Sequence, residues 1–155
     1  MGRAVDLLIV DDDATQLQLV EAMLRELGLQ HRCHYAPNGF KALDFLHRLH
    51  PFEKAPRPQL ILLDLNMPGM NGCEVLQQLK SDPALLSIPV IMFSSSQAEK
   101  DVSACYQGHG NAYIRKPADY EETLTIFRDL DRFWAQSAML GNEAGFERSG
   151  PEIKS

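Results

Sequence analysis

Short apolar runs typical of β-strands alternate along this chain with stretches of helical periodicity. Such an alternation predicts a parallel sheet whose strands are joined by crossover helices. Strands covered on both faces are almost continuously apolar, whereas more polar strands suit the sheet edges. Three apolar runs cover residues 5–10, 59–63 and 89–93, and two more polar runs cover residues 31–36 and 111–115. We therefore expect an α/β fold, a flavodoxin-like doubly wound sheet of five parallel strands in the order 2-1-3-4-5.

The helical stretches and the chain length indicate one domain. The chain has 155 residues, which supports a single core of ordinary size. Apolar residues recur at helical spacing over residues 14–27, with Gly28 as the expected C-cap. Further helices are expected over residues 97–107 and from Tyr120 to Trp134. We expect the folded domain to span residues 4–138 and residues 139–155, rich in Gly, Glu and Ser, to form a flexible tail.

Composition argues against several classes of partner. The formal net charge is −6 and no dense Lys/Arg run occurs, so direct binding to nucleic acid is not expected. The apolar runs are too short to cross a bilayer, and the N-terminus lacks the apolar segment of a secretory signal. The three cysteines, Cys33, Cys73 and Cys105, are odd in number and widely spaced, which suits a reducing compartment. We expect a cytoplasmic protein that does not enter the membrane.

Five polar residues stand at the carboxyl ends of the predicted strands. They are Asp11, Asp12, Asp64, Ser94 and Lys116. Ligands of open α/β sheets bind just outside the carboxyl ends of the strands. The sequence therefore predicts that three carboxylates, one hydroxyl and one ammonium group meet in a single crevice.

The three carboxylates predict a divalent cation. Closely packed carboxylates repel one another, and one takes up a proton unless a cation intervenes. Mg²⁺ prefers octahedral oxygen ligands and keeps several waters. We assign Asp12 and Asp64 as direct ligands, Asn66 as a ligand through its backbone carbonyl, and Asp11 as a ligand mainly through water.

Asp64 is also the candidate nucleophile. It follows the most hydrophobic and central strand, and carboxylates form acyl phosphates. Mg²⁺ and Lys116 would offset the charge of an incoming phosphoryl group, which is most of what such a reaction requires. Ser94 can donate a hydrogen bond to a phosphoryl oxygen. This set of residues predicts phosphoryl transfer onto Asp64.

The motifs at the strand ends resemble the receiver domain of two-component response regulators, in order and in spacing. The matching segments are Ile9-Val10-Asp11-Asp12, Leu62-Leu63-Asp64-Leu65-Asn66-Met67-Pro68-Gly69, Ser94-Ser95 and Lys116-Pro117. The resemblance implies a signalling protein rather than an enzyme, phosphorylated on Asp64 by a histidine kinase. It also implies that Lys116 is the active-site lysine, Ser94 the switch hydroxyl in place of the commoner Thr, and Tyr113 the aromatic switch residue.

A closer resemblance concerns single-domain regulators paired with bacterial phytochromes. It is carried by the proline-rich residues 50–58, by residues 57–66, and by Phe133-Trp134. It implies a phytochrome histidine kinase as the partner. Phosphorylation would then be transmitted through protein contacts, by a homodimer or by docking on the kinase.

Two other functions fit parts of the sequence. Residues 11–15 match the D-x-D-x-T signature of haloacid dehalogenase-type phosphatases, but no paired acidic motif follows a later strand and no cap domain fits in the chain. A phosphate sink, with no downstream partner, is the other alternative. Asp13 is interpreted as a helix-capping residue outside the site. The five histidines are expected at the surface or at sheet edges rather than as metal ligands.

Overall fold

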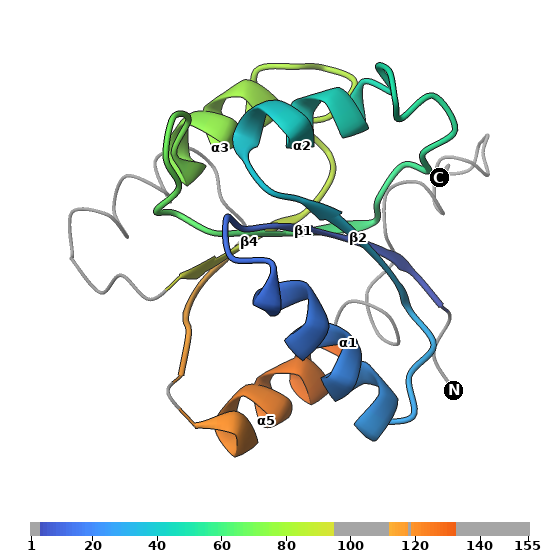
Figure 1. Cartoon of the computed structure of the whole chain (residues 1–155), viewed down its shortest axis with the longest axis vertical. Coiled ribbons are helices and arrows are strands. Elements are labelled where there is room, and N and C mark those ends of the chain that lie inside the picture. The colour runs from blue at the N-terminus through green and yellow to red at the C-terminus, as the bar shows by residue number, and fades with distance from the viewer. Residues whose placement is uncertain (1–3, 95–111, 118, 133–155) are drawn as a thin grey trace, which may run out of the picture.

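Five parallel strands form one sheet in the order β2-β1-β3-β4-β5, as the sequence predicts. A computed structural model of the chain describes residues 4–94, 112–117 and 119–132 (Figure 1). The strands are β1 (Asp6–Val10), β2 (Arg32–Ala36), β3 (Leu60–Leu63), β4 (Val90–Ser94) and β5 (Ala112–Arg115). The helix predicted over residues 97–107, the end of the last helix at Trp134 and the predicted tail at 139–155 lie outside the described residues.

The burial of each strand follows its composition. Every residue of β1, β3 and β4 is buried, because helices cover both faces of the sheet there. The polar strands β2 and β5 lie at the two edges and are mostly half-exposed. Alternate side chains of β1 enter opposite cores: Leu8 joins one hydrophobic cluster and Leu7 the other. The two faces of the sheet are therefore packed separately.

In the part of the chain that the structure describes, four helices cover the two faces. They are α1 (Thr15–Glu26), α2 (Gly39–Leu46), α3 (Gly72–Lys80) and α5 (Tyr120–Leu130). Helices α2 and α3 lie on one face of the sheet, and α1 and α5 lie on the other (Figure 1). Among the described residues, no helix combines the length and the apolar character needed to cross a membrane.

Local sequence signals determine where α3 begins and where α1 ends. Helix α3 starts with a capping box, in which the Asn71 side chain accepts from the Glu74 backbone and the Glu74 side chain accepts from the Asn71 backbone, both at 2.9 Å. Gly28 follows α1 with φ +72°, and its N–H donates to the Arg25 carbonyl at 3.1 Å. Leu27 occupies the C-cap position and Gly28 follows it in the left-handed conformation, so the predicted C-cap is displaced by one residue.

His31 directly precedes the edge strand β2, in line with the expectation for the histidines, but its side chain is buried. Its side chain is only 6% exposed, and its Nε2 lies 2.5 Å from Oδ1 of Asp131. Its Nδ1 accepts from the Val5 backbone N–H at 3.0 Å, so the ring carries its proton on Nε2 and donates it to Asp131. The burial of the His31 side chain was not predicted, because Asp131, which covers it, is 100 residues away in the sequence.

Candidate functional site

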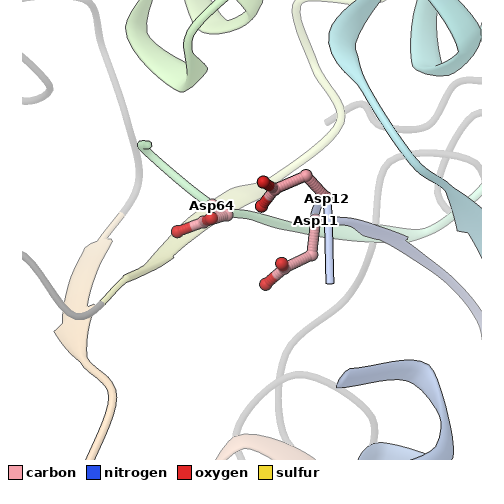
Figure 2. A group of neighbouring side chains, drawn as sticks. All are labelled: Asp11, Asp12 and Asp64. Carbon is pink, nitrogen blue, oxygen red and sulfur yellow. The ribbon is translucent and has the colours of Figure 1, made fainter. Parts of the chain in front are cut away.

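Three carboxylates meet at the carboxyl edge of the sheet. Asp11 and Asp12 follow β1, Asp64 follows β3, and these two strands are paired in parallel. One oxygen from each carboxylate lies within 4.8 Å of the others. Figure 2 shows the three side chains projecting into the same space. The structure thus brings these acids together as the sequence predicts.

The surroundings of the three acids favour a bound cation. Asp11 is 3% exposed and Asp64 is 7% exposed, whereas Asp12 faces the solvent. Burial is the main reason that the pKa of Asp64 is raised, and the charges of Asp11 and Asp12 raise it further; Lys116 and a hydrogen bond from Ser94 act in the opposite direction. Buried carboxylate oxygens crowded in this way are the ligands that Mg²⁺ and Mn²⁺ prefer. The residues present therefore fit a divalent cation.

Lys116 reaches the acids from the end of β5. Its Nζ lies 2.6 Å from Oδ2 of Asp11 and 3.9 Å from Oδ1 of Asp64. Its backbone N–H donates to the Ser94 carbonyl at 2.8 Å, which fixes the start of its side chain beside β4. The ammonium group also lies 5.9 Å from the centre of the Phe93 ring. Lys116 therefore pairs with Asp11 more closely than with Asp64, a preference that the sequence did not predict.

The other predicted site residues take different positions. Ser94 ends β4, is fully buried and hydrogen-bonds to Asp64. Tyr113 lies on β5 opposite Met92 of β4, half-buried against the core beneath α2 and α3. Asn66 is exposed, two residues beyond Asp64. Asp13 stays outside the cluster, since its Oδ1 accepts from the backbone and hydroxyl of Thr15 at 3.0 and 2.7 Å.

Tyr35 contributes to the site although sequence reasoning did not select it. Its hydroxyl donates to the Asp11 carbonyl at 2.7 Å. Burial, followed by the charges of Asp11, Asp12 and Asp13, raises the pKa of this phenol, so the group keeps its proton at neutral pH. The sequence offered one signal for Tyr35, its position next to the end of the predicted edge strand. In the structure Tyr35 pairs with Ile9, two residues before Asp11.

Gly72 is a second residue that sequence reasoning missed. A Cβ atom at this position would lie 2.2 Å from the Asp64 carbonyl oxygen and 2.7 Å from the Leu65 Cα. Its N–H donates to the Leu65 carbonyl at 2.8 Å. The start of α3 therefore packs against the backbone of Asp64 at a distance that only glycine permits.

Comparison with known proteins agrees with this geometry. The sequence matches the family described as the response regulator receiver domain over residues 7–128. The response regulator Rcp1 of Synechocystis sp. is 34% identical over 134 residues, which cover 86% of this chain and 91% of that protein. The chemotaxis protein CheY-3 of Vibrio cholerae is 31% identical over 134 residues, covering 86% of this chain and 95% of that protein.

Solved structures give the same result. The phosphorylated cyanobacterial phytochrome response regulator RcpA superposes with a TM-score of 0.83 at 34% identity, covering 89% of this chain and 99% of that chain. The Mn²⁺-bound form of Rcp1 superposes with a TM-score of 0.81 at 34% identity, covering 88% and 99%. These comparisons lend no support to a phosphate sink or to a haloacid dehalogenase-type phosphatase. This chain belongs to the response regulator receiver domain family, the signalling proteins of two-component systems.

Proposed function

We propose that this receiver accepts a phosphoryl group on Asp64 from a histidine kinase, with Mg²⁺ bound beside it. The observation that carries the proposal is the meeting of Asp64 with Asp11, Asp12 and Lys116 at one edge of the sheet. Asp64 lies between the other two acids and Ser94, whereas Asp11 is already held by the ammonium group at 2.6 Å. Asp64 is therefore the carboxylate best placed to act as the nucleophile.

The metal would be held by Asp11, Asp12, Asp64 and the backbone carbonyl of Asn66. When bound, Mg²⁺ supplies positive charge that stabilises the oxygens of a transferring phosphoryl group. The residues of the chain supply the rest. Lys116 brings a second positive charge to the same edge, and the buried Ser94 hydroxyl can donate to a phosphoryl oxygen on Asp64.

The Ser94 hydroxyl could also couple phosphorylation of Asp64 to a change at the protein surface. Ser94 and Tyr113 lie on neighbouring strands, and the two strands pair along their length, with Ser94 opposite Arg115. We propose that Ser94 moves toward the phosphoryl group and that Tyr113 turns inward in response. The half-exposed edge formed by β5 would then change shape with phosphorylation.

Acetyl phosphate with Mg²⁺ tests the acceptor directly. The wild-type chain should give a shifted band in Phos-tag electrophoresis, and mass spectrometry should place the added phosphoryl group on Asp64. Asp64→Asn should give no shift. Asp13→Asn is the matched control, because Asp13 is a neighbouring acid whose carboxylate bonds only to Thr15 among the described residues. It should be phosphorylated within about threefold of the wild-type rate.

A shift that persists in Asp64→Asn would contradict the assigned acceptor. The metal assignment has its own test, since EDTA should abolish the wild-type shift and Asp12→Asn should raise the Mg²⁺ concentration needed for half-maximal phosphorylation. Phosphorylation that proceeds equally well in EDTA would contradict the metal site.

We propose a histidine kinase of the bacterial phytochrome type as the phosphodonor. Support comes from RcpA, a phytochrome response regulator 34% identical to this chain, and from the bacteriophytochrome response regulator RtBRR, 38% identical with a TM-score of 0.69. Phosphotransfer profiling against the histidine kinases of the source organism should show the fastest transfer from a phytochrome kinase. A consistently faster transfer from another kinase would contradict this partner.

We further propose that the phosphorylated protein acts in the cytoplasm through protein contacts, as a homodimer. The net charge of −6 argues against direct contact with nucleic acid. The edge strand β5 and helix α5 offer the surface next to Tyr113. Sedimentation velocity with and without acetyl phosphate should show a phosphorylation-dependent increase in dimer. A monomer under both conditions would contradict the dimer and favour docking on the kinase.

A further inference from the structure

We propose that Tyr35 is a positioning residue for the metal site, because its hydroxyl fixes the backbone that carries Asp11 and Asp12. The proposal rests on the proposed function, since it concerns the same cation. Tyr35 lies on the edge strand β2, 24 residues from Asp11 in sequence, and its hydroxyl donates to the Asp11 carbonyl at 2.7 Å.

Asp11 is held at every polar group that it has. Its backbone N–H donates to the Ala36 carbonyl at 3.2 Å, and its backbone carbonyl accepts from Tyr35. Its carboxylate Oδ1 accepts from the Asp13 N–H at 2.9 Å, and its Oδ2 pairs with Lys116 at 2.6 Å. The end of β2 therefore holds the backbone of Asp11 through two hydrogen bonds, one from its N–H to the main chain of Ala36 and one to its carbonyl from the side chain of Tyr35.

The Tyr35 bond is the one that acts beyond the regular ladder of the sheet. The pairing of β1 with β2 ends at Val10 opposite Ala36, so the carbonyl of Asp11 lies past the last paired residue. Asp11 is 3% exposed, which leaves its carbonyl little access to water. Among the described residues, the Tyr35 hydroxyl donates the hydrogen bond to that carbonyl. A buried carbonyl without a donor is costly, so the loop would shift if this hydroxyl were removed.

A shift of this loop would move the metal ligands relative to one another. The Asp11 carbonyl belongs to the peptide that joins Asp11 to Asp12, so its orientation sets the direction in which Asp12 leaves β1. Asp64 is carried by the separate strand β3, so a reorientation of that peptide would change the position of Asp12 relative to Asp64. Loss of a residue that orients a metal ligand by hydrogen bonding, without contacting the metal itself, typically changes metal affinity by about 10- to 100-fold. Tyr35 acts on the backbone rather than on a carboxylate, so we expect an effect of about tenfold.

The test is Tyr35→Phe, which removes the hydroxyl and keeps the ring. Tyr120→Phe is the matched control, because it removes a phenol hydrogen bond of similar length, 2.6 Å to Oε1 of Glu26, that does not involve the three carboxylates. Binding of Mn²⁺ alone is followed by the electron paramagnetic resonance signal of the free ion. The Mn²⁺ dissociation constant should rise by about tenfold in Tyr35→Phe and by less than twofold in Tyr120→Phe.

A second measurement separates positioning from general damage. The rate of phosphorylation by acetyl phosphate is measured against Mg²⁺ concentration. Tyr35→Phe should need about tenfold more Mg²⁺ for half-maximal rate, with a maximal rate within about twofold of wild type. A residue that only supported the fold would lower the melting temperature without moving the Mg²⁺ midpoint.

The outcomes distinguish this proposal from the function on which it rests. Wild-type protein that binds Mn²⁺ and is phosphorylated, together with Tyr35→Phe values within twofold of wild type, overturns the role of Tyr35 alone. Wild-type protein that binds no Mn²⁺ overturns the metal site and the role of Tyr35 together. An equal loss of Mn²⁺ affinity in Tyr120→Phe would also overturn the proposal, because the effect would not be specific to the bond with Asp11.

Discussion

Replacing Gly72 with alanine adds one methyl group where the backbone around Asp64 leaves no space. The new Cβ would lie 2.2 Å from the Asp64 carbonyl oxygen and 2.7 Å from the Leu65 Cα. Ordinary contacts of a Cβ begin at 3.4 Å. Both neighbours are backbone atoms that cannot rotate away, so the start of α3 and the end of β3 must separate by about 1 Å. The separation moves the peptide that carries Asp64.

The expected loss of stability follows from two opposing effects. Overpacking typically costs about 1–3 kcal/mol, and the lower entropy of the unfolded chain with alanine returns about 0.4–1 kcal/mol. The net loss in the free energy of unfolding is therefore about 1.5 kcal/mol. At about 2–4 °C per kcal/mol for a chain of this size, the melting temperature should fall by about 3–6 °C.

The effect on phosphorylation should be larger than the effect on stability. A displacement of about 1 Å at a reacting group can cost up to about 100-fold in rate. Phosphorylation of Gly72→Ala by acetyl phosphate at saturating Mg²⁺ should therefore be at least about tenfold slower than wild type. Thermal melts followed by circular dichroism and time courses by Phos-tag electrophoresis give the two quantities.

Gly28→Ala is the control for stability loss away from the site. Gly28 has φ +72° with no atom within 4 Å of a new Cβ, so alanine there suffers only the left-handed backbone penalty of about 1–2 kcal/mol. It follows the end of α1 that is remote from Asp11 and Asp12, since the 12 residues of α1 span about 18 Å. This variant should melt lower while keeping the wild-type phosphorylation rate.

Two results would refute the reasoning. Gly72→Ala that melts within 1 °C of wild type and is phosphorylated at the wild-type rate would show that the close approach has no consequence. Equal losses of phosphorylation in Gly72→Ala and Gly28→Ala would show that any destabilisation, rather than displacement of Asp64, slows the reaction.

Three further predictions concern groups outside the site. His31→Ala removes a buried donor to Asp131, so the free energy of unfolding in urea should fall by about 1–3 kcal/mol, and an unchanged value would contradict the buried pair. The hydrogen bond from Arg32 lowers the pKa of Asp6, although burial acts in the opposite direction. The ionised Asp6 therefore stabilises the folded state above the ordinary pKa of 3.8, and this stabilisation is lost as pH falls through the folded-state pKa. The stability advantage of wild type over Asp6→Asn should therefore shrink between pH 6 and pH 3, and an advantage that stays constant would refute this. Burial raises the pKa of Cys33 to about 11, so iodoacetamide at pH 8 should label it at least about 100-fold more slowly in the folded chain than in urea, by mass spectrometry; equal rates would be inconsistent with that burial.

Much of the fold was predictable from local patterns. Strands buried on both faces are apolar along almost their whole length, so β1, β3 and β4 could be predicted as central strands from the sequence. The polar edge strands followed from the same rule. The order of the strands then placed their carboxyl ends together, and with them Asp11, Asp12 and Asp64.

Element boundaries were less predictable, because they depend on contacts with other segments. The first predicted strand began at Val5, whereas β1 begins at Asp6. Asp13 was expected to cap the first helix, and its carboxylate does bond to the first helical residue, Thr15, although Ala14 occupies the N-cap position. Such shifts of one residue depend on hydrogen bonds that the local sequence does not specify.

The sequence by itself determined which chemical groups this protein has and the edge of the sheet at which they gather, because strand periodicity and strand order are properties of the pattern. Only the tertiary structure decided how those groups are held. The hydrogen bond from Tyr35 to Asp11 joins residues 24 positions apart. The ion pair of Lys116, which is closer to Asp11 than to Asp64, joins residues 105 positions apart. Contacts of this kind depend on the packing of side chains from separate elements, and no local pattern in the sequence encodes that packing.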